Sequence, residues 1–122
     1  MGDQPKRKPV RFVGSARSDL RAFPREVKLV FASALSAAQL GGKHRDSKVL
    51  KGFGGANVLE IADDHDGDTY RGVYTVRFAS IIYVLHAFQK KSKRGSETSK
   101  RDMDLIRQRL KSAEQDYKSE HK

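Results

Sequence analysis

The sequence predicts a small α+β domain in which an antiparallel or mixed β-sheet packs against helices, and three observations predict it. Residues 70–91 have the pattern of two neighbouring strands, one alternating and one apolar almost throughout. Apolar residues recur at helical spacing over residues 27–38 and 103–117. The 122 residues are enough for one domain that buries roughly 65% of its unfolded surface. The predicted order is β, α, α, β, β, β, α, with the helices on one face of the sheet.

The N-terminal part of the domain is predicted to form an edge strand and two helices. Residues 10–13 are short and β-prone, and Ser15 or Ser18 is suited to cap a short helix that ends near residue 23. Pro24 suits the first position of the second helix, where its missing N–H is not needed. The pair Gly41-Gly42 then ends that helix.

The middle of the chain is predicted to form a loop and a strand that enters a hairpin. Residues 43–55 are basic and glycine-rich, which indicates a loop, and residues 57–62 have the apolar content of a strand. Asp66-Gly67 is a hairpin-turn signal, so residues 63–69 are expected to be the hairpin loop.

The two strands that follow are expected to pair antiparallel across a tight turn at Ala79-Ser80. If Phe78 and Ile81 are the last pair before the turn, Arg71 lies opposite Phe88. The first strand alternates, which places Arg71 on the face opposite to the Tyr74 and Phe78 side chains.

A terminal helix completes the predicted domain, and its start is marked by the capping-box pattern Ser99-x-x-Asp102. We expect residues 1–9 to be a basic flexible tail, residues 10–117 to be a single domain, and residues 118–122 to be a short C-terminal tail.

Composition predicts a basic cytoplasmic protein with an anionic partner. The formal net charge is +10, and its positive charges gather at residues 43–51 and 89–101, whereas residues 60–68 are acidic. The chain contains no cysteine, so it has neither a disulfide framework nor a thiolate metal site. The charged N-terminus is unlike a signal peptide, and no apolar run approaches the roughly 20 residues of a membrane span, so no membrane partner is expected.

Metal and cofactor motifs are not found, so we expect neither a metal nor a cofactor. The acidic stretch at residues 64–68 fails the calcium-loop pattern, because Ala62 and Val73 occupy its first and last ligand positions. The four histidines lack zinc-ligand spacing. The glycine-rich residues 52–55 are not followed by the Gly-Lys-Ser/Thr of a phosphate-binding loop.

His86 and the cations around it are the candidate site. The apolar strand brings His86, Lys90 and Lys91 to one edge of the sheet, next to a strand that carries Arg71 and Arg77. RNA cleavage by internal attack needs a base, an acid and cations that stabilise the charge on phosphorus, and these residue types supply all three.

Each of these residues also has a structural interpretation. His86 is equally well explained as a core histidine, and Arg71 as half of a salt bridge with Glu60. The run from Lys90 to Arg94 fits either a solvated loop or an RNA-binding segment, and its clustered charge favours RNA by about two to one.

The chain resembles the RelE/HigB superfamily of bacterial toxins, in its phage-derived branch, over roughly residues 10–113. The residues that carry the resemblance are Lys48-Val49-Leu50-Lys51-Gly52, Val58-Leu59-Glu60-Ile61, Tyr70-Arg71-Gly72-Val73-Tyr74 and Leu85-His86-Ala87-Phe88-Gln89-Lys90-Lys91. The sequence departs from the family pattern at Ala62, where an arginine is expected, and at Thr98 and Ser99, where some members have a tyrosine.

This resemblance implies a RelE-like fold and a metal-independent endoribonuclease that cleaves mRNA, often on the ribosome, and so inhibits translation and arrests growth. It also implies a helix-turn-helix antitoxin as partner. The alternatives are a catalytically silent module that binds RNA or a protein partner, and a basic ribosome-associated structural protein.

In the toxin interpretation, Arg71, Lys90 and Lys91 stabilise the phosphate. His86 transfers a proton, and Glu60 positions His86 or Arg71. The residues expected to bind the RNA backbone are Lys48, Lys51, Lys93 and Arg94.

Overall fold

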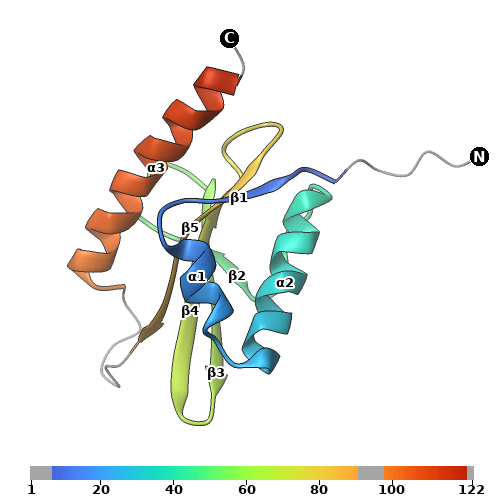
Figure 1. Ribbon diagram of the computed structural model, residues 1–122, viewed down its shortest axis with the longest axis vertical. Helices are drawn as coiled ribbons and strands as arrows, with labels where there is room; N and C mark the ends of the chain where they lie inside the picture. The colour runs from blue at the N-terminus through green and yellow to red at the C-terminus, as the bar shows by residue number, and fades with distance from the viewer. Residues whose placement is uncertain (1–6, 91–97, 121–122) are drawn as a thin grey trace, which may run out of the picture.

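The computed structural model describes residues 7–90 and 98–120 of the chain (Figure 1). Its elements, in chain order, are β1 (Val10–Phe12), α1 (Ala16–Arg21), α2 (Arg25–Gln39), β2 (Ser47–Val49), β3 (Val58–His65), β4 (Asp68–Thr75), β5 (Ile82–Lys90) and α3 (Lys100–Glu120).

The five strands form one mixed sheet in the order β1-β5-β4-β3-β2. β1 runs parallel to β5 at one edge, and the other three pairings are antiparallel. The predicted α+β class is therefore confirmed, together with the N-terminal helices and the C-terminal helix.

Helices cover both faces of this sheet, so the expectation that they lie on one face is wrong. α1 and α2 pack on one face, and α3 packs alone on the other (Figure 1). The reason is that the central strands are apolar on both sides. Tyr74 and Val84 face α1 and α2, whereas Val73 and Leu85 face α3.

On the face of the sheet under α2, the helix packs very close to strand β4. Gly72 in β4 has no side chain, and a Cβ atom there would lie 3.3 Å from Cε2 of Phe31. Phe31 is 2% exposed and packs with Phe23, Val27, Ile61 and other apolar side chains. A larger residue at position 72 would force the Phe31 ring away from the sheet.

The β3–β4 hairpin turns at Asp66-Gly67 as predicted, but the loop is much shorter than residues 63–69. Both turn residues have positive φ, 50° and 85°, as in the two-residue turns that match the twist of paired strands. β3 therefore continues to His65 and pairs with β4 up to Asp68.

The connection from β4 to β5 is longer than the predicted two-residue turn. β4 ends at Thr75, and Phe78 packs on the α3 face, where it contacts the rings of Tyr83 and Tyr117. The pairing of Arg71 with Phe88 is confirmed, but the register shifts by one residue between Val73 and Tyr74.

That shift is a β-bulge in β5. Val73 pairs with His86 and Tyr74 pairs with Val84, so Leu85 is the extra residue. As a result Leu85 and His86 both lie on the α3 face, and Ala87 lies on the α2 face.

Sequence analysis missed β2, which lies inside the predicted loop 43–55. Its three residues pair with β3, and Ser47 is held by a 2.7 Å hydrogen bond to the Tyr74 hydroxyl. Burial raises the pKa of Tyr74, and the bond to Ser47 partly offsets this. A three-residue edge strand with Lys48 in its centre has too little apolar periodicity to be recognised.

The described N-terminal residues are bound to α2, and the described C-terminal residues belong to α3. In the predicted N-terminal tail, the backbone N–H of Lys8 donates to the carbonyl of Gln39, and the Gln39 amide donates to the carbonyl of Lys8. α3 continues to Glu120, three residues beyond the predicted domain end. Within the described residues, no helix combines the length and the apolar character that crossing a bilayer requires.

Candidate active site

α3 covers only part of its face of the sheet, and the uncovered part is a depression over β2, β3 and β4. Lys48 pairs with Glu60 and Ala62 pairs with Arg71, which brings side chains from three strands to this surface. The depression has a volume of ≈ 380 Å³. Its lining residues are Arg45, Asp46, Lys48, Glu60, Ala62 and Arg71.

Arg71 and Glu60 form the only buried ion pair of this depression that the structure describes. Nη1 of Arg71 donates a 2.7 Å hydrogen bond to Oε1 of Glu60, and the two side chains are 8% and 14% exposed. Nε of Arg71 is buried and has no hydrogen-bond partner among the residues that the structure describes. A buried guanidinium with an unused donor is suited to bind an anion, because an unsatisfied buried N–H is costly.

A residue just before α3 also contacts Glu60. Oγ1 of Thr98 donates a 2.7 Å hydrogen bond to Oε2 of Glu60. Both carboxylate oxygens of Glu60 therefore accept a hydrogen bond, one from β4 and one from the segment before α3. Thr98 was not among the predicted site residues, although the sequence pattern marked Thr98 and Ser99 as the place where some members of the resembled family have a tyrosine.

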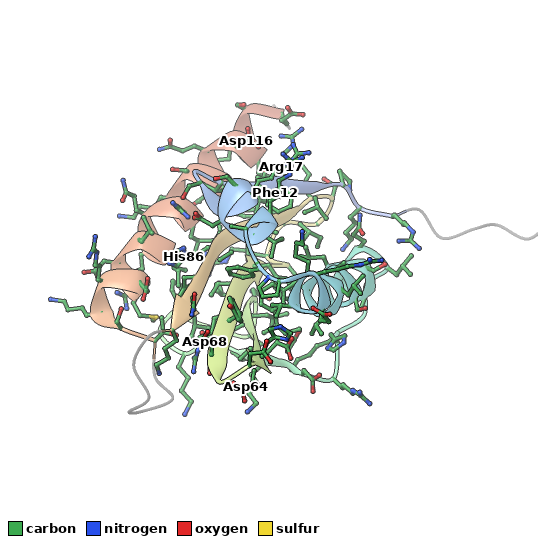
Figure 2. All side chains as sticks on the ribbon, turned by 60° about the horizontal axis from the view of Figure 1, so that its bottom comes forward. Phe12, Arg17, Asp64, Asp68, His86 and Asp116 are labelled. Atoms are coloured by element: carbon green, nitrogen blue, oxygen red, sulfur yellow. The ribbon has the colours of Figure 1, made fainter. Side chains whose placement is uncertain are left out.

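His86 lies between β5 and α3 (Figure 2), next to Asp102 in the first turn of that helix, and it is not among the residues that line the depression. Its Nε2 is 2.8 Å from Oδ1 of Asp102, and its Nδ1 is 3.5 Å from Nη1 of Arg109. A guanidinium can only donate, so Nδ1 acts as the acceptor and Nε2 carries the proton that Asp102 accepts. The ring also stacks on Phe88 at a centroid distance of 4.4 Å.

Asp102 belongs to the capping box that the sequence predicted. Its backbone N–H donates to Oγ of Ser99 at 3.1 Å, and its Oδ2 is 2.7 Å from the same hydroxyl. The Asp102 carboxylate therefore takes part both in the helix cap, through Ser99, and in the contact with His86. Because His86 belongs to β5, this carboxylate fixes the start of α3 to that strand. Sequence analysis identified the cap but not Asp102 as a partner of His86.

The predicted cations are only partly assembled. Lys90 is the last residue of β5 and pairs with Thr69. Lys91, Lys93 and Arg94 lie outside the described residues. Lys51 is exposed in the loop after β2.

Arg77 does not join this site. Its Nη2 donates to the carbonyl of Phe53 at 2.9 Å, in the loop between β2 and β3. The sequence placed Arg77 beside Arg71 because it continued β4 through residue 78, whereas the strand ends at Thr75.

Two members of the predicted site are paired with carboxylates. Glu60 neutralises Arg71, and Asp102 contacts His86. The salt bridge between Arg71 and Glu60, which the sequence left open as an alternative, is present in the structure.

A second polar cluster fixes the C-terminal half of α3 to β1 and β5. The Tyr83 hydroxyl donates to Asp116 at 2.6 Å, and Arg11 donates to the same carboxylate at 2.6 Å. Desolvation, followed by the bond to Asp116, raises the pKa of Tyr83 to about 12. The hydrogen bonds from Tyr83 and Arg11 lower the pKa of Asp116. This cluster lies at the opposite end of α3 from His86 (Figure 2).

Two solved structures resemble this chain. The E. coli toxin RelE, solved in the free state as a double arginine-to-alanine mutant, covers 87% of this chain and 97% of its own, with 15% identity and a TM-score of 0.56. A toxin–antitoxin complex, RelBE2 of Mycobacterium tuberculosis, matches 75% of this chain and 100% of its own, with 20% identity and a TM-score of 0.46. The first likeness shows that the chain has the RelE fold.

Sequence comparison assigns the family. None of the curated proteins matches the sequence significantly. The family model described as "Phage derived protein Gp49-like (DUF891)" matches residues 18–111, which include α2, all of the sheet except β1, and the first half of α3. The predicted relationship to the phage-derived branch of the RelE/HigB superfamily is thereby confirmed, and the chain belongs to the phage-derived Gp49-like family.

Proposed function

We propose that this protein is the toxin of a type II toxin–antitoxin system and acts as a metal-independent endoribonuclease on mRNA. The observation that carries the proposal is the buried Arg71–Glu60 pair in a depression that Arg45 and Lys48 also line. Family membership and the RelE fold support the same class.

In the proposed reaction, the ribose 2′-hydroxyl of the RNA attacks the adjacent phosphorus. Glu60 takes the hydroxyl proton, because its carboxylate lies beside the guanidinium that would hold the phosphate. Arg71 stabilises the negative charge that develops on the phosphoryl oxygens. The bond from phosphorus to the 5′-oxygen breaks, and the products are a 2′,3′-cyclic phosphate and a 5′-hydroxyl.

A lysine protonates the leaving 5′-oxygen in this proposal. Lys90 lies two residues beyond the Phe88 that pairs with Arg71, which makes it a diagonal neighbour about 7–8 Å away. Lys91 is the other candidate. His86, which is 9% exposed with contacts at both ring nitrogens, is better suited to hold β5 and α3 together than to exchange a proton with RNA.

The remaining cations would bind the RNA backbone, and the protein would meet its substrate on the ribosome. In this proposal Lys48, which lines the depression, and Lys51, which is exposed in the following loop, contact flanking phosphates. Lys93 and Arg94 have the same proposed role. A helix-turn-helix antitoxin would neutralise the toxin.

A catalytically silent binding module is the second candidate, and Ala62 favours it. Ala62 pairs directly with Arg71, so the arginine that the family pattern expects at this position would have been the nearest second cation. With Glu60 already neutralising Arg71, the remaining positive charge at the phosphate position is small.

Cleavage of RNA by the purified chain separates these candidates. Toxin function predicts growth arrest on induction without a partner, and RNA fragments ending in 2′,3′-cyclic phosphate that form equally well in EDTA. Arg71→Lys retains the charge but loses the planar fork, and should lower kcat roughly 10²-fold. Arg25→Ala, an exposed arginine on α2, is the matched control and should retain full activity.

Soluble expression with normal growth and no cleavage would exclude the nuclease. Retained RNA binding in that protein would instead support the binding module. Activity that EDTA abolishes and magnesium restores would contradict the proposed chemistry.

A further inference from the structure

Arg71 depends on Glu60 for its orientation. The pair is joined by one described hydrogen bond, from Nη1, while Nε is buried and has no partner within residues 7–90 and 98–120. If Arg71 were the only partner of the Glu60 carboxylate, the flexible Glu60 side chain could rotate, and the guanidinium would move with it. Whatever fixes Glu60 therefore also fixes Arg71.

Thr98 is the side chain that fixes Glu60. Its hydroxyl donates to Oε2, the carboxylate oxygen that Arg71 does not use. Thr98 is itself held, because it precedes Ser99, whose hydroxyl caps α3, and Asp102 in the same turn contacts His86 in β5. A rigid helix start thus reaches across the sheet to β3.

We infer that Thr98 is a positioning residue for the candidate active site, which acts on a phosphodiester through Glu60 and Arg71. The inference rests on the proposed function for its substrate, but the contact itself exists without RNA. Because a displacement of about 1 Å in a reacting group can cost about 10²-fold in rate, a loosened Glu60 should lower kcat far more than it changes KM.

Two variants of Thr98 and one of Ser99 test this inference. Thr98→Val is nearly isosteric and removes only the hydroxyl, and should lower kcat for RNA cleavage at least tenfold with KM changed less than twofold. Thr98→Ser retains the hydroxyl and should restore kcat to within about threefold of the original protein. Ser99→Ala removes the helix cap but keeps the Thr98 hydroxyl, so it should lower the melting temperature and lower kcat much less than Thr98→Val does.

A second measurement does not need cleavage. In the ¹⁵N spectrum, the Nε–Hε signal of Arg71, assigned by its loss in Arg71→Lys, should be sharp in the original protein and in Thr98→Ser. In Thr98→Val it should broaden, or its proton should exchange faster with water. If these spectra behave as expected but no variant cleaves RNA, the positioning role stands and the nuclease proposal fails.

An unchanged kcat and an unchanged Arg71 signal in Thr98→Val would overturn the inference. So would equal losses of kcat in Thr98→Val and Ser99→Ala, because the effect would then come from the helix start in general.

Discussion

The face of the sheet under α1 and α2 and the face under α3 bury different kinds of side chain. Under α2 the contacts are almost entirely apolar, with Phe31 against Gly72 at the centre and the Ser47–Tyr74 bond as the exception. Under and beside α3 the sheet buries charged and titratable groups: Arg71, Glu60 and His86. The α2 face is therefore mainly an apolar packing face, whereas the α3 face combines an apolar cluster around Val73, Leu85 and Ile106 with buried charged groups that are costly to desolvate.

The helices reflect this difference. α2 packs its apolar side directly on the strands, whereas α3 is tied at both ends by polar contacts, to His86 at its start and to Tyr83 and Arg11 near its end. If the two faces differ as described, variants on the α2 face should change stability alone, and variants on the α3 face should change activity as well.

Phe31→Ala should give the largest loss of stability. It removes a fully packed ring and leaves a cavity over Gly72, so the free energy of unfolding should fall by about 3–5 kcal/mol. Urea denaturation measures this, and kcat of the folded fraction should be unchanged. A loss below about 1 kcal/mol would mean that the α2 face is not the main source of stability.

Arg71→Ala should destabilise the protein by about 3 kcal/mol, because it leaves a mostly buried Glu60 carboxylate without its charge partner. The double variant Arg71→Met with Glu60→Leu should recover most of that stability in the same denaturation experiment, but no activity. If the single variant is as stable as the original protein, the ion pair is not formed in solution.

High pH should weaken the attachment of α3. The folded-state pKa of Tyr83 is raised from 10.0 to about 12, so the folded state keeps this proton longer than the unfolded chain does. The contribution is full below pH 10 and is lost as pH rises toward 12.

Between pH 9 and 12, the free energy of unfolding should therefore fall less steeply with pH in Tyr83→Phe than in the original protein. Tyr74→Phe is the comparison on the other face, since burial raises the pKa of Tyr74 as well. Identical pH profiles for Tyr83→Phe and the original protein would contradict the role of Tyr83.

Lys48→Ala should have the smallest effect on the fold and a measurable one on binding. Lys48 is exposed in β2, so its removal should change stability by less than about 0.5 kcal/mol. RNA affinity should fall and the salt dependence of binding should decrease by about one unit, with the rate at saturating RNA unchanged. A large loss of the saturated rate would instead assign Lys48 to the catalytic group.

The fold class and the pairing of Arg71 with Phe88 could be predicted because they depend on local pattern and on the approximate position of one turn. β2 could not, because an edge strand of three residues gains its stability from pairing with β3. The covering of both faces was missed because the alternation in residues 70–78 suggested a half-buried strand, although its second face carries Val73 and Thr75, which are also fully buried.

The candidate site was predictable in its residue types but not in its contacts. Arg71 and Glu60 were both singled out, and their salt bridge was one of two alternatives that residue spacing alone could not separate. The approach of Thr98 to Glu60 and of Asp102 to His86 depends on where α3 crosses the sheet, which is set by packing over long sequence separations.

The extra residue in β5 sets the phase of the strand. With strict alternation, His86 would share a face with Ile82 and Val84 and would point into the apolar layer under α1 and α2. Leu85 shifts the phase by one, so everything from His86 to Lys90 changes sides. A variant that lacks Leu85 should therefore lose the bulge but keep the site: β5 would alternate regularly from Ile82 to Lys90, with His86, Phe88 and Lys90 still on the side of Arg71.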